Sequence, residues 1–521
     1  MILTGLCRNG SQRVGTTSVM LLRLLAAAAL LSSSACQPEE PKKPRLVLLY
    51  ASCSLNRHFL GPYDSSVSYT PNIDRLGSRS VVFTAHHTEA GQSGTSYASL
   101  FSGTHAMRHG VYDHPKRLPD YLFMITEAFE AHGWRSFSFA QHPMASANLN
   151  YVQGVHKSRR FPRRLVAEHK GFVRLLNRLQ RRPDFKAFAV TNFTVTHYPY
   201  GGLGMDLSEE IEAFCGPRPD ECAFVSEHPE EFERLRQMYY GHLSELMFNH
   251  DVAVEELGLS PEDVSNLVST IEFLYKLGVV RLDNLFGAVL QEIEKRGLLD
   301  ETLIAFTTDH GEIMYRENAF FQWTHGYQQA PEVIGIPLLL HIPGVAPRNY
   351  NAVTRSIDVF PTLLGLSGLK YPADHVQGVD LSDEIRSGGE REGLLAFSHS
   401  DVLPDSIVKG GDLPAMEHFG SFYPRRDPEL MWVSVRSGNL FYKLRRLSPA
   451  GFTPFLFDIG ADPTELHNLF DPDDADQQSM FSRLEEYRGH LLRGFGAAEE
   501  GIDLVPEAEK IRLLRSLGYI E

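Results

Sequence analysis

The chain has 521 residues, of which 43% are hydrophobic and 22% are charged, so it can bury a large core and is not globally disordered. Its formal net charge of -15 argues against general nucleic-acid binding, which requires a basic surface. We therefore expect one large domain with a smaller appendage, and no nucleic-acid partner.

Residues 1–36 predict a targeting segment rather than part of the fold. Residues 20–35 read MLLRLLAAAALLSSSA, in which one arginine precedes a short apolar run and then small residues. The apolar run is too short for an ordinary membrane span and is typical of a signal peptide. We expect export, with Met20 as an alternative start of translation.

Cys36 directly follows this segment and predicts attachment of a lipid. Ser33 stands where a lipoprotein signal usually carries leucine, so cleavage by ordinary signal peptidase is the alternative. Residues 37–44 form a linker rich in proline, glutamate and lysine. The expected product is periplasmic, or a lipoprotein held at the membrane by its lipid anchor.

The cysteines beyond the targeting segment divide into a pair and a single residue. Cys215 and Cys222 bracket a short polar loop, FCGPRPDEC, which suits a disulfide in an oxidising compartment. Cys53 is left alone, and an unpaired cysteine in an exported protein is either buried and inert or has a chemical role.

Four apolar runs predict the strands of a mostly parallel sheet buried on both faces: residues 46–51, 185–193, 303–307 and 337–341. Helical stretches separate them, as an α/β layered fold requires. One helix begins at Ser260-Pro261, where serine is a good cap and proline suits the first turn, and ends near Gly297.

Two further regions differ from this pattern. Residues 201–258 read as an acidic, mostly helical insertion. From residue 377 the sequence predicts antiparallel strands of a smaller C-terminal subdomain, residues 377–521, which leaves residues 45–376 as the main domain.

Polar residues follow three of the predicted strands. Cys53 follows the first strand, His197 the second, and Asp309 with His310 the third. Ligands of open α/β sheets bind beyond the carboxyl ends of the strands. The three clusters are therefore expected to meet in one site.

Several segments resemble, in order, those of the sulfatase family of the alkaline-phosphatase superfamily: LVLLYASCSLNRHFLGPYD, SYASLFSGTHAMRHGV, GLLDETLIAFTTDHGE, THGYQQAPEVIGIPLLLHIPG and FLFDIGADPTELHNL. The resemblance covers about residues 45–470. It implies an alkaline-phosphatase-like layered fold with a mostly parallel central sheet, plus a small C-terminal α+β subdomain with an antiparallel sheet. It also implies metal-dependent cleavage or transfer of a sulfate or phosphate ester.

The resemblance assigns roles to four residues. Asp309 and His310 match metal ligands of the family, and a carboxylate with an imidazole suits a divalent cation. His325, in Trp-Thr-His-Gly, matches a histidine that binds the transferring group or a second metal. His197, in Thr-His-Tyr-Pro-Tyr, matches one that contacts the ester oxygens or the leaving group, so it is both a catalytic and a substrate-binding candidate.

The first departure from the family concerns the metal. Cys53 stands where the family has one or two aspartates after its first strand. A thiolate beside Asp309 and His310 favours zinc over calcium, magnesium or manganese. The alternative is that Cys53 only fills space and that the metal site has lost its function.

The second departure concerns the nucleophile. Sulfatases carry Cys or Ser, any residue, Pro, any residue, Arg, and the Cys or Ser becomes formylglycine. Ser93 holds the nucleophile position here, but Thr95 and Tyr97 replace the proline and arginine. We expect Ser93 to stay unmodified and to attack as a metal-activated hydroxyl, with Thr95 as the nucleophile if the register slips by two. His86 and His87 are either extra ligands or ordinary strand or loop residues.

The leading expectation is thus an exported, metal-dependent hydrolase or transferase acting on a sulfated glycan or a phosphorylated headgroup. The alternative is a non-catalytic sulfatase-like module that binds an anionic glycan or a lipid headgroup. Specificity is expected to come from the insertion and loops rather than from the shared core.

Overall fold

The computed structural model describes residues 43–112, 116–140, 149–151, 153–155, 157–158, 165–317, 319, 321–401, 428–448 and 451–499. The predicted targeting segment, with Cys36, lies outside these residues. Within them, no helix is both long enough and apolar enough to cross a membrane.

The centre of the fold is a strand that is buried along its whole length. β1 (Leu46–Ser52) pairs in parallel with β6 (Ala187–Phe193) on one side and β7 (Thr302–Thr308) on the other. The last residues of these strands are in register, so the loops that follow them emerge at the same edge of the sheet. This confirms the parallel sheet that the apolar runs predict.

Five more strands complete the sheet, whose order is β5-β4-β6-β1-β7-β8-β2-β9. The strands β4 (Arg135–Ala140), β5 (Lys157–Ser158), β2 (Val81–Phe83) and β9 (Arg348–Tyr350) share the direction of β1. The fourth apolar run forms β8 (Leu338–His341), which is antiparallel to both of its neighbours. Of the eight described strands, it alone is reversed.

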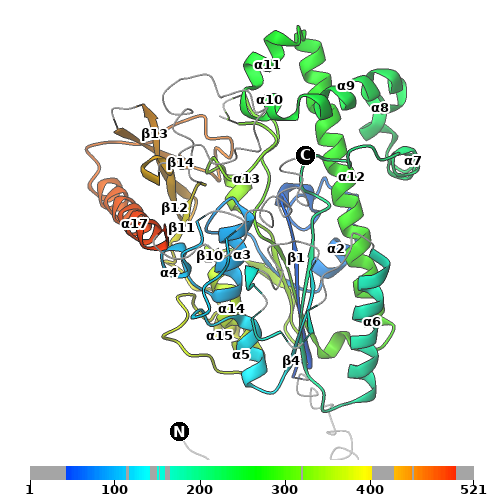
Figure 1. The fold of residues 1–521 in the computed structure, drawn as a ribbon, viewed down its shortest axis with the longest axis vertical. Helices are drawn as coiled ribbons and strands as arrows, with labels where there is room; N and C mark the ends of the chain where they lie inside the picture. The colour runs from blue at the N-terminus through cyan, green and yellow to red at the C-terminus, as the bar shows by residue number, and fades with distance from the viewer. Residues whose placement is uncertain are drawn as a thin grey trace, which may run out of the picture. The chain divides into compact units, whose positions relative to one another are not determined.

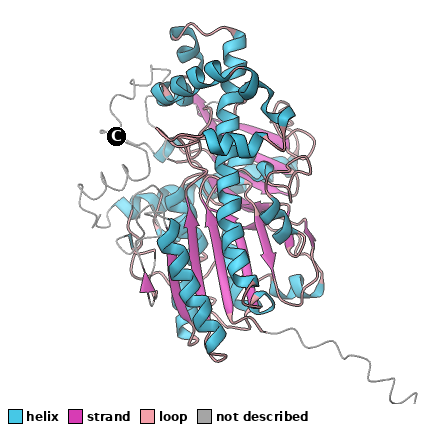
Figure 2. Ribbon diagram, turned by 90° about the vertical axis from the view of Figure 1, so that its right-hand side faces the viewer, coloured by secondary structure: helices cyan, strands magenta, loops and turns pink. Residues whose placement is uncertain are grey.

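Helices cover both faces of the sheet (Figure 2). The helix α12 (Pro261–Glu294) contacts both α2 (Pro71–Gly77) and α6 (Leu165–Arg181), while α3 (Ser93–Ser102), α5 (Ile125–Ala131) and α14 (Ser356–Leu366) contact one another. The long α12 begins as predicted, because the Ser260 side chain accepts a hydrogen bond from the backbone N–H of Asp263.

The insertion is helical, as predicted, and lies at the top of Figure 1. It comprises α7 (Ser208–Cys215), α8 (Ala223–Glu227), α9 (Pro229–Gly241), α10 (Leu243–Phe248) and α11 (His250–Glu256). A disulfide joins Cys215 to Cys222, with their Cα atoms 5.5 Å apart, and this confirms the predicted pairing.

The C-terminal region contains a four-stranded antiparallel sheet, as predicted. Its strands are β11 (Ala396–His399), β12 (Val433–Ser437), β13 (Leu440–Ser448) and β14 (Gly451–Asp458), and α17 (Ala475–Glu499) packs against β12 and β13. The chain from Lys43 onward is one compact unit, so the subdomain boundary at residue 377 stays a prediction.

Shorter elements connect these parts. They are β3 (His86–His87), β10 (Thr354–Arg355), α4 (Ala106–His109), α13 (Pro331–Ile334), α15 (Ser382–Ser387) and the 3-10 turns Arg57–Phe59, Pro219–Cys222, Leu299–Glu301 and Pro428–Leu430.

A buried carboxylate ties α17 to the main domain. Glu89 accepts hydrogen bonds from Ser99 Oγ at 2.7 Å, His105 Nδ1 at 3.0 Å, the Ala106 backbone N–H at 3.1 Å and Tyr487 Oη of α17 at 3.1 Å. Burial alone would raise the pKa of Glu89, but the charge and the hydrogen bond of His105 outweigh it and lower the pKa to about 2.

Candidate active site

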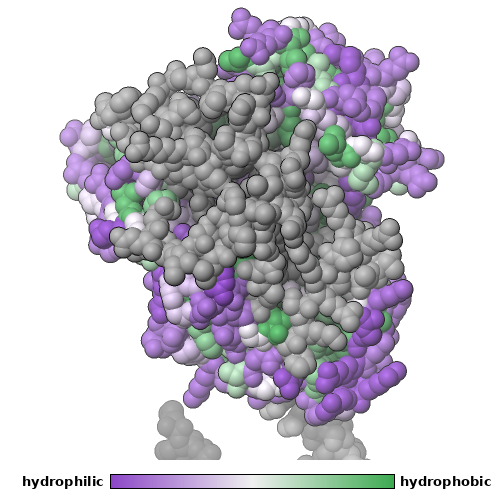
Figure 3. Space-filling model, in the orientation of Figure 1, coloured by the Kyte–Doolittle hydropathy of each residue, from purple (hydrophilic) through white to green (hydrophobic). Residues whose placement is uncertain are grey.

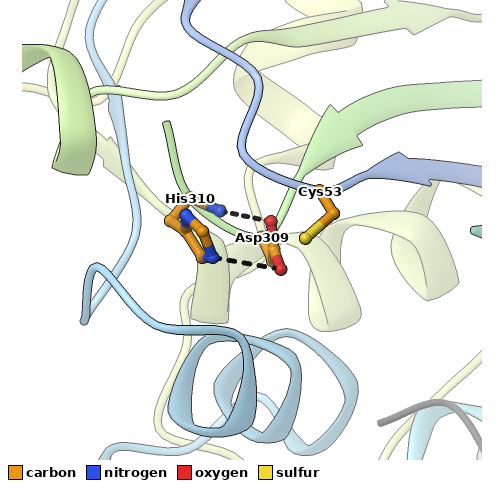
Figure 4. Close-up of side chains that lie close together, drawn as sticks. All are labelled: Cys53, Asp309 and His310. Carbon is orange, nitrogen blue, oxygen red and sulfur yellow. Dashed lines mark hydrogen bonds and ion pairs between the residues drawn. The ribbon is translucent and has the colours of Figure 1, made fainter. Parts of the chain in front are cut away.

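Three side chains from two neighbouring strand ends meet at the carboxyl edge of the sheet. Cys53 directly follows β1, and Asp309 and His310 directly follow β7. The Cys53 sulfur, an Asp309 carboxylate oxygen and a His310 ring nitrogen all lie within 4.8 Å of one another, and all three residues are buried (Figure 4). The structure thus brings together the three residues predicted to hold a metal.

Hydrogen bonds orient Asp309 and His310. His310 Nδ1 donates to the carbonyl oxygen of Gly311 at 2.9 Å, which leaves the lone pair of Nε2 directed away from that carbonyl. Asp309 Oδ1 accepts the backbone N–H groups of Ser54 and His310 at 3.2 Å and 2.7 Å. Asp309 Oδ2 accepts no hydrogen bond from any described residue and lies 3.4 Å from His310 Nε2. A buried carboxylate oxygen left without a hydrogen bond is costly, and a cation would satisfy it.

Ser93 begins α3 and faces the same group. The Gln92 side chain caps this helix by accepting the backbone N–H of Gly94 at 2.8 Å. Ser93 Oγ lies 3.7 Å from Cys53 Sγ and 3.2 Å from His310 Nε2. Ser93 therefore places a hydroxyl within 3.7 Å of two of the three predicted ligands.

Thr95 is used differently. Its hydroxyl donates to the carbonyl oxygen of Val111 at 2.9 Å and is contacted by the Gln92 amide. These hydrogen bonds hold the Thr95 side chain against Val111 and Gln92. The geometry favours Ser93 over Thr95 as the nucleophile.

Three of the donor–donor distances in this group are close to those around a four-coordinate cation. In a tetrahedral zinc site, bond lengths of about 2.0 Å to nitrogen and oxygen and about 2.3 Å to sulfur place N and O ligands about 3.3 Å apart and S and O ligands about 3.5 Å apart. Here His310 Nε2 lies 3.2 Å from Ser93 Oγ and 3.4 Å from Asp309 Oδ2. The distance from Cys53 Sγ to Ser93 Oγ is 3.7 Å. The donor set Cys53, Asp309, His310 and the Ser93 hydroxyl therefore fits such an ion.

The chemistry of Cys53 depends on that ion. Burial, and then the charge of Asp309, raise the pKa of the Cys53 thiol well above its usual value. A thiol in such surroundings is protonated and unreactive unless a cation displaces the proton.

Tyr97 replaces the family arginine and turns to the end of β1. Its hydroxyl donates to the carbonyl oxygen of Ser52 at 2.7 Å and accepts a hydrogen bond from the Asn192 amide. Tyr97 thus fixes the strand end that precedes Cys53, a role that the sequence did not predict.

The two predicted histidines lie beside the metal-ligand group. The His325 ring centroid is 4.1 Å from that of His310 and 5.1 Å from that of His197. His197 Nδ1 donates to the carbonyl oxygen of Tyr198 at 2.6 Å, and burial lowers the pKa of His197 to about 4. His197 is therefore neutral at pH 7.

His325 has a partner that the sequence did not predict. Its Nδ1 lies 3.1 Å and 3.2 Å from the two carboxylate oxygens of Glu312, and both side chains are buried. Burial raises the pKa of Glu312 well above its usual value, against a lowering effect of the hydrogen bond from Tyr200. Glu312 belongs to the Asp-His-Gly-Glu motif, but His325 lies thirteen residues later in the chain, outside that motif. The motif alone therefore does not predict that the two residues pair.

The helical insertion supports the loop that carries His325. The His250 ring of α11 packs edge-on against Tyr315 and Trp323, with centroids 5.2 Å and 5.3 Å away. Tyr200, just after His197, donates to the carbonyl oxygen of Trp323 at 3.0 Å. The insertion and both histidine loops are thus packed as one unit.

His86 and His87 lie in β3 and have other partners. His86 Nδ1 is 2.9 Å from Thr354 Oγ1, and His87 Nε2 accepts a hydrogen bond from Arg436 at 2.7 Å. Across the described parts of the chain, only the Cys53 group has the spacing expected of three metal ligands. The two residues are ordinary strand residues.

Comparison with known proteins finds similarity to sulfatases. The Sulfatase family model matches residues 274–369, which include Asp309, His310 and His325. An ulvan-active sulfatase of Formosa agariphila is 23% identical over 452 residues, which cover 83% of this chain and 78% of that protein. The chain is thus similar to the sulfatase family. Within this family, arylsulfatase K of Xenopus laevis is 25% identical over 203 residues, 39% of this chain and 34% of that protein.

Solved structures share the fold of this protein. A protein in complex with its substrate D-glucosamine-2-N,6-O-disulfate superimposes with a TM-score of 0.62 at 16% identity, over 87% of this chain and 99% of the other. The phosphonate monoester hydrolase of Agrobacterium radiobacter gives a TM-score of 0.57 at 21% identity, over 86% and 96% of the two chains.

Proposed function

We propose that this sulfatase-like protein is an exported, metal-dependent hydrolase or transferase that cleaves a sulfate or phosphate ester with Ser93 as the nucleophile. The observation that carries the proposal is the position of Ser93 Oγ, 3.2 Å from His310 Nε2 and 3.7 Å from Cys53 Sγ at the carboxyl edge of the sheet. A helix-capped serine buried among potential metal ligands has few roles other than nucleophile or ligand.

Cys53, Asp309 and His310 would hold the cation. The soft thiolate makes zinc the favoured ion over calcium, magnesium or manganese. When bound, a divalent ion lowers the pKa of the Ser93 hydroxyl and offsets negative charge on the ester. The fit rests on the oxygen of Asp309 that no described residue hydrogen-bonds and on the three short distances between donor atoms.

The chemistry of the chain's own residues follows in two stages. Ser93, whose hydroxyl would release its proton to solvent when the ion binds, forms a bond from Oγ to sulfur or phosphorus, the bond to the leaving oxygen breaks, and His325 gives that oxygen a proton. Water or a second alcohol then gives its proton to His325 and attacks the Ser93 ester, which frees Ser93 Oγ and gives hydrolysis or transfer. His325 is the better proton donor because its imidazolium would be the counter-charge that the buried Glu312 carboxylate needs, whereas burial lowers the pKa of His197 and leaves that ring neutral.

The state of Ser93 affects the reaction class. A formylglycine hydrate can expel sulfate by collapsing to the aldehyde, but a plain serine ester has no such exit. With Thr95 and Tyr97 in place of proline and arginine, Ser93 is expected to stay serine, which favours phosphoryl over sulfuryl transfer. Relatives support both substrate classes, since one binds a sulfated glucosamine and another hydrolyses phosphonate monoesters.

The proposed location is the periplasm, with lipid attached at Cys36. The short apolar run abutting this cysteine supports it. The intact mass of membrane-extracted protein tests it, since a soluble chain starting at another residue would exclude the lipid.

The test uses purified mature protein with 4-nitrophenyl phosphate, 4-nitrophenyl sulfate and 4-nitrophenyl phenylphosphonate. Ser93→Ala should abolish turnover, whereas Thr95→Val, the matched control, should retain it if it folds. Peptide mass spectrometry around Ser93 should show unmodified serine, and the aldehyde mass would instead indicate an ordinary sulfatase. Wild-type protein that binds metal and sulfated glycans but turns over none of the esters would support the non-catalytic binding module instead.

A further inference from the structure

The helix α6 has one strongly cationic face. Its buried residues Phe172, Leu175, Leu176 and Leu179 repeat at helical spacing and face the core. The opposite face and the two residues around its end are exposed and basic. We name this face the cationic stripe; it consists of Lys170, Arg174, Arg178, Arg181 and Arg182.

The cationic stripe is unusual because most of its positive charges have no described acidic partner, although the chain as a whole is acidic. Four of its residues follow one another at intervals of four, so each repels the next along the helix. Arg182 is 3.0 Å from Asp184, but no described acidic residue pairs with the other four. In α9, by contrast, Arg234 pairs with a glutamate three residues earlier.

The net charge of this segment is opposite in sign to that of the whole chain. Residues 165–186 contain six lysines and arginines and two acids, in a chain whose formal net charge is -15. An exposed helix face usually mixes both signs, and uncompensated repulsion weakens the helix. Such a face is best explained by an anionic partner that offsets the repulsion when bound.

The chain enters the fold directly beside the stripe. Arg45, one residue before β1, donates from Nη1 to the carbonyl oxygens of Leu179 and Arg182 at 3.0 Å and 3.1 Å. Cys36 is only nine residues before Arg45, and nine residues span at most about 30 Å. A lipid on Cys36 would therefore keep the end of the stripe close to a bilayer surface.

We propose that the cationic stripe binds the anionic phospholipid headgroups of the bilayer in which Cys36 is anchored. This inference rests on the export and lipid attachment of the proposed function. Hydrophilic residues cover the lower right margin of Figure 3, where Figure 1 places α6. The end of the stripe lies at the amino edge of the sheet, beside Arg45, and the candidate active site lies at the carboxyl edge, beyond Ser52. Headgroup binding at α6 thus leaves the site uncovered.

The experiment is co-sedimentation of the chain from residue 37 onward, which carries no lipid, with vesicles of phosphatidylcholine alone or mixed with phosphatidylglycerol. Binding is expected only to the anionic vesicles and should weaken as salt is added. A triple variant, Lys170→Gln/Arg174→Gln/Arg178→Gln, should bind roughly 100-fold more weakly, because each cation near such a surface contributes about five-fold.

The matched control removes the same charge elsewhere. Arg234→Gln/Lys370→Gln/Arg483→Gln changes three exposed cations on three separate segments and should bind nearly as well as wild type. Equal losses in the two triple variants would show general electrostatics and overturn the proposal. The stripe variant should melt no lower than wild type, because it relieves repulsion along α6.

Heparin provides the second arm of the test. Wild-type protein that binds heparin but not phosphatidylglycerol vesicles would make the stripe a polyanion site and overturn the membrane assignment. Because the assay uses neither an ester substrate nor a lipidated chain, its outcome is independent of whether Ser93 is catalytic and whether Cys36 is modified.

Discussion

The pairing of Glu312 with His325 leads to a sharp prediction. If Glu312 stabilises the proton that His325 gives to the leaving oxygen, Glu312→Gln should slow esters whose leaving group needs a proton. Hydrogen bonds to charged groups contribute about 1.5–3 kcal/mol, and the pair here has N···O distances of 3.1 Å and 3.2 Å in buried surroundings. The expected loss is therefore about 10- to 150-fold in kcat/KM.

The assay compares phenyl phosphate with 4-nitrophenyl phosphate. Phenolate is a poor leaving group and requires protonation, whereas 4-nitrophenolate leaves without it. Glu312→Gln should therefore slow phenyl phosphate by the full factor and 4-nitrophenyl phosphate only slightly. Metal content should match that of wild type, since Glu312 is outside the Cys53 group.

Two controls separate this role from a structural one. Glu332→Gln removes another partly buried carboxylate, which pairs with Arg316 at 2.9 Å and 3.1 Å, and should slow both esters equally or not at all. In a His325→Gln background, Glu312→Gln should have little further effect. Equal slowing of both esters by Glu312→Gln, or full additivity with His325→Gln, would refute the reasoning.

Three further predictions concern the metal, acid stability and the disulfide. Asp309→Ala should lose the roughly one equivalent of zinc that elemental analysis is expected to find, and Cys53→Ala should weaken zinc binding; a Cys53→Ala protein with full metal and activity would show that the thiol only packs. Because the pKa of Glu89 is lowered to about 2, its stabilising contribution, roughly 3 kcal/mol, is complete above about pH 4.5 and is lost as the pH falls toward 2. Urea unfolding of Glu89→Gln should show a shallower decline in unfolding free energy over that range, and an unchanged decline would exclude Glu89 as its source. Reduction of the Cys215–Cys222 disulfide should cost on the order of 2 kcal/mol, measured as a lower thermal midpoint with activity retained; since the bridge closes a short loop, global unfolding on reduction would contradict this account.

The sequence alone was sufficient for the framework of the fold. Runs such as residues 46–51 and 303–307 are continuously apolar because both faces of these strands are buried, and that pattern is local. The same logic placed Cys53 and Asp309 at strand ends, because parallel neighbours in register release their loops at one edge. The sequence did not predict that β8 is antiparallel to its neighbours, because an apolar run does not indicate the direction of its strand.

What only the tertiary structure decided was the direction and partner of each side chain. Ser93 and Thr95 lie two residues apart in one turn, and only the packing around Val111 shows that Thr95 is engaged elsewhere. Glu312 and His325 meet because the intervening loop folds back on itself, a long-range event that no spacing rule predicts. The apolar period of α6 is visible in the sequence, but its nearness to the start of β1 depends on Arg45 reaching the carbonyls at the end of that helix. Local patterns determine which elements form, whereas hydrogen bonds between distant segments determine which chemistry they bring together.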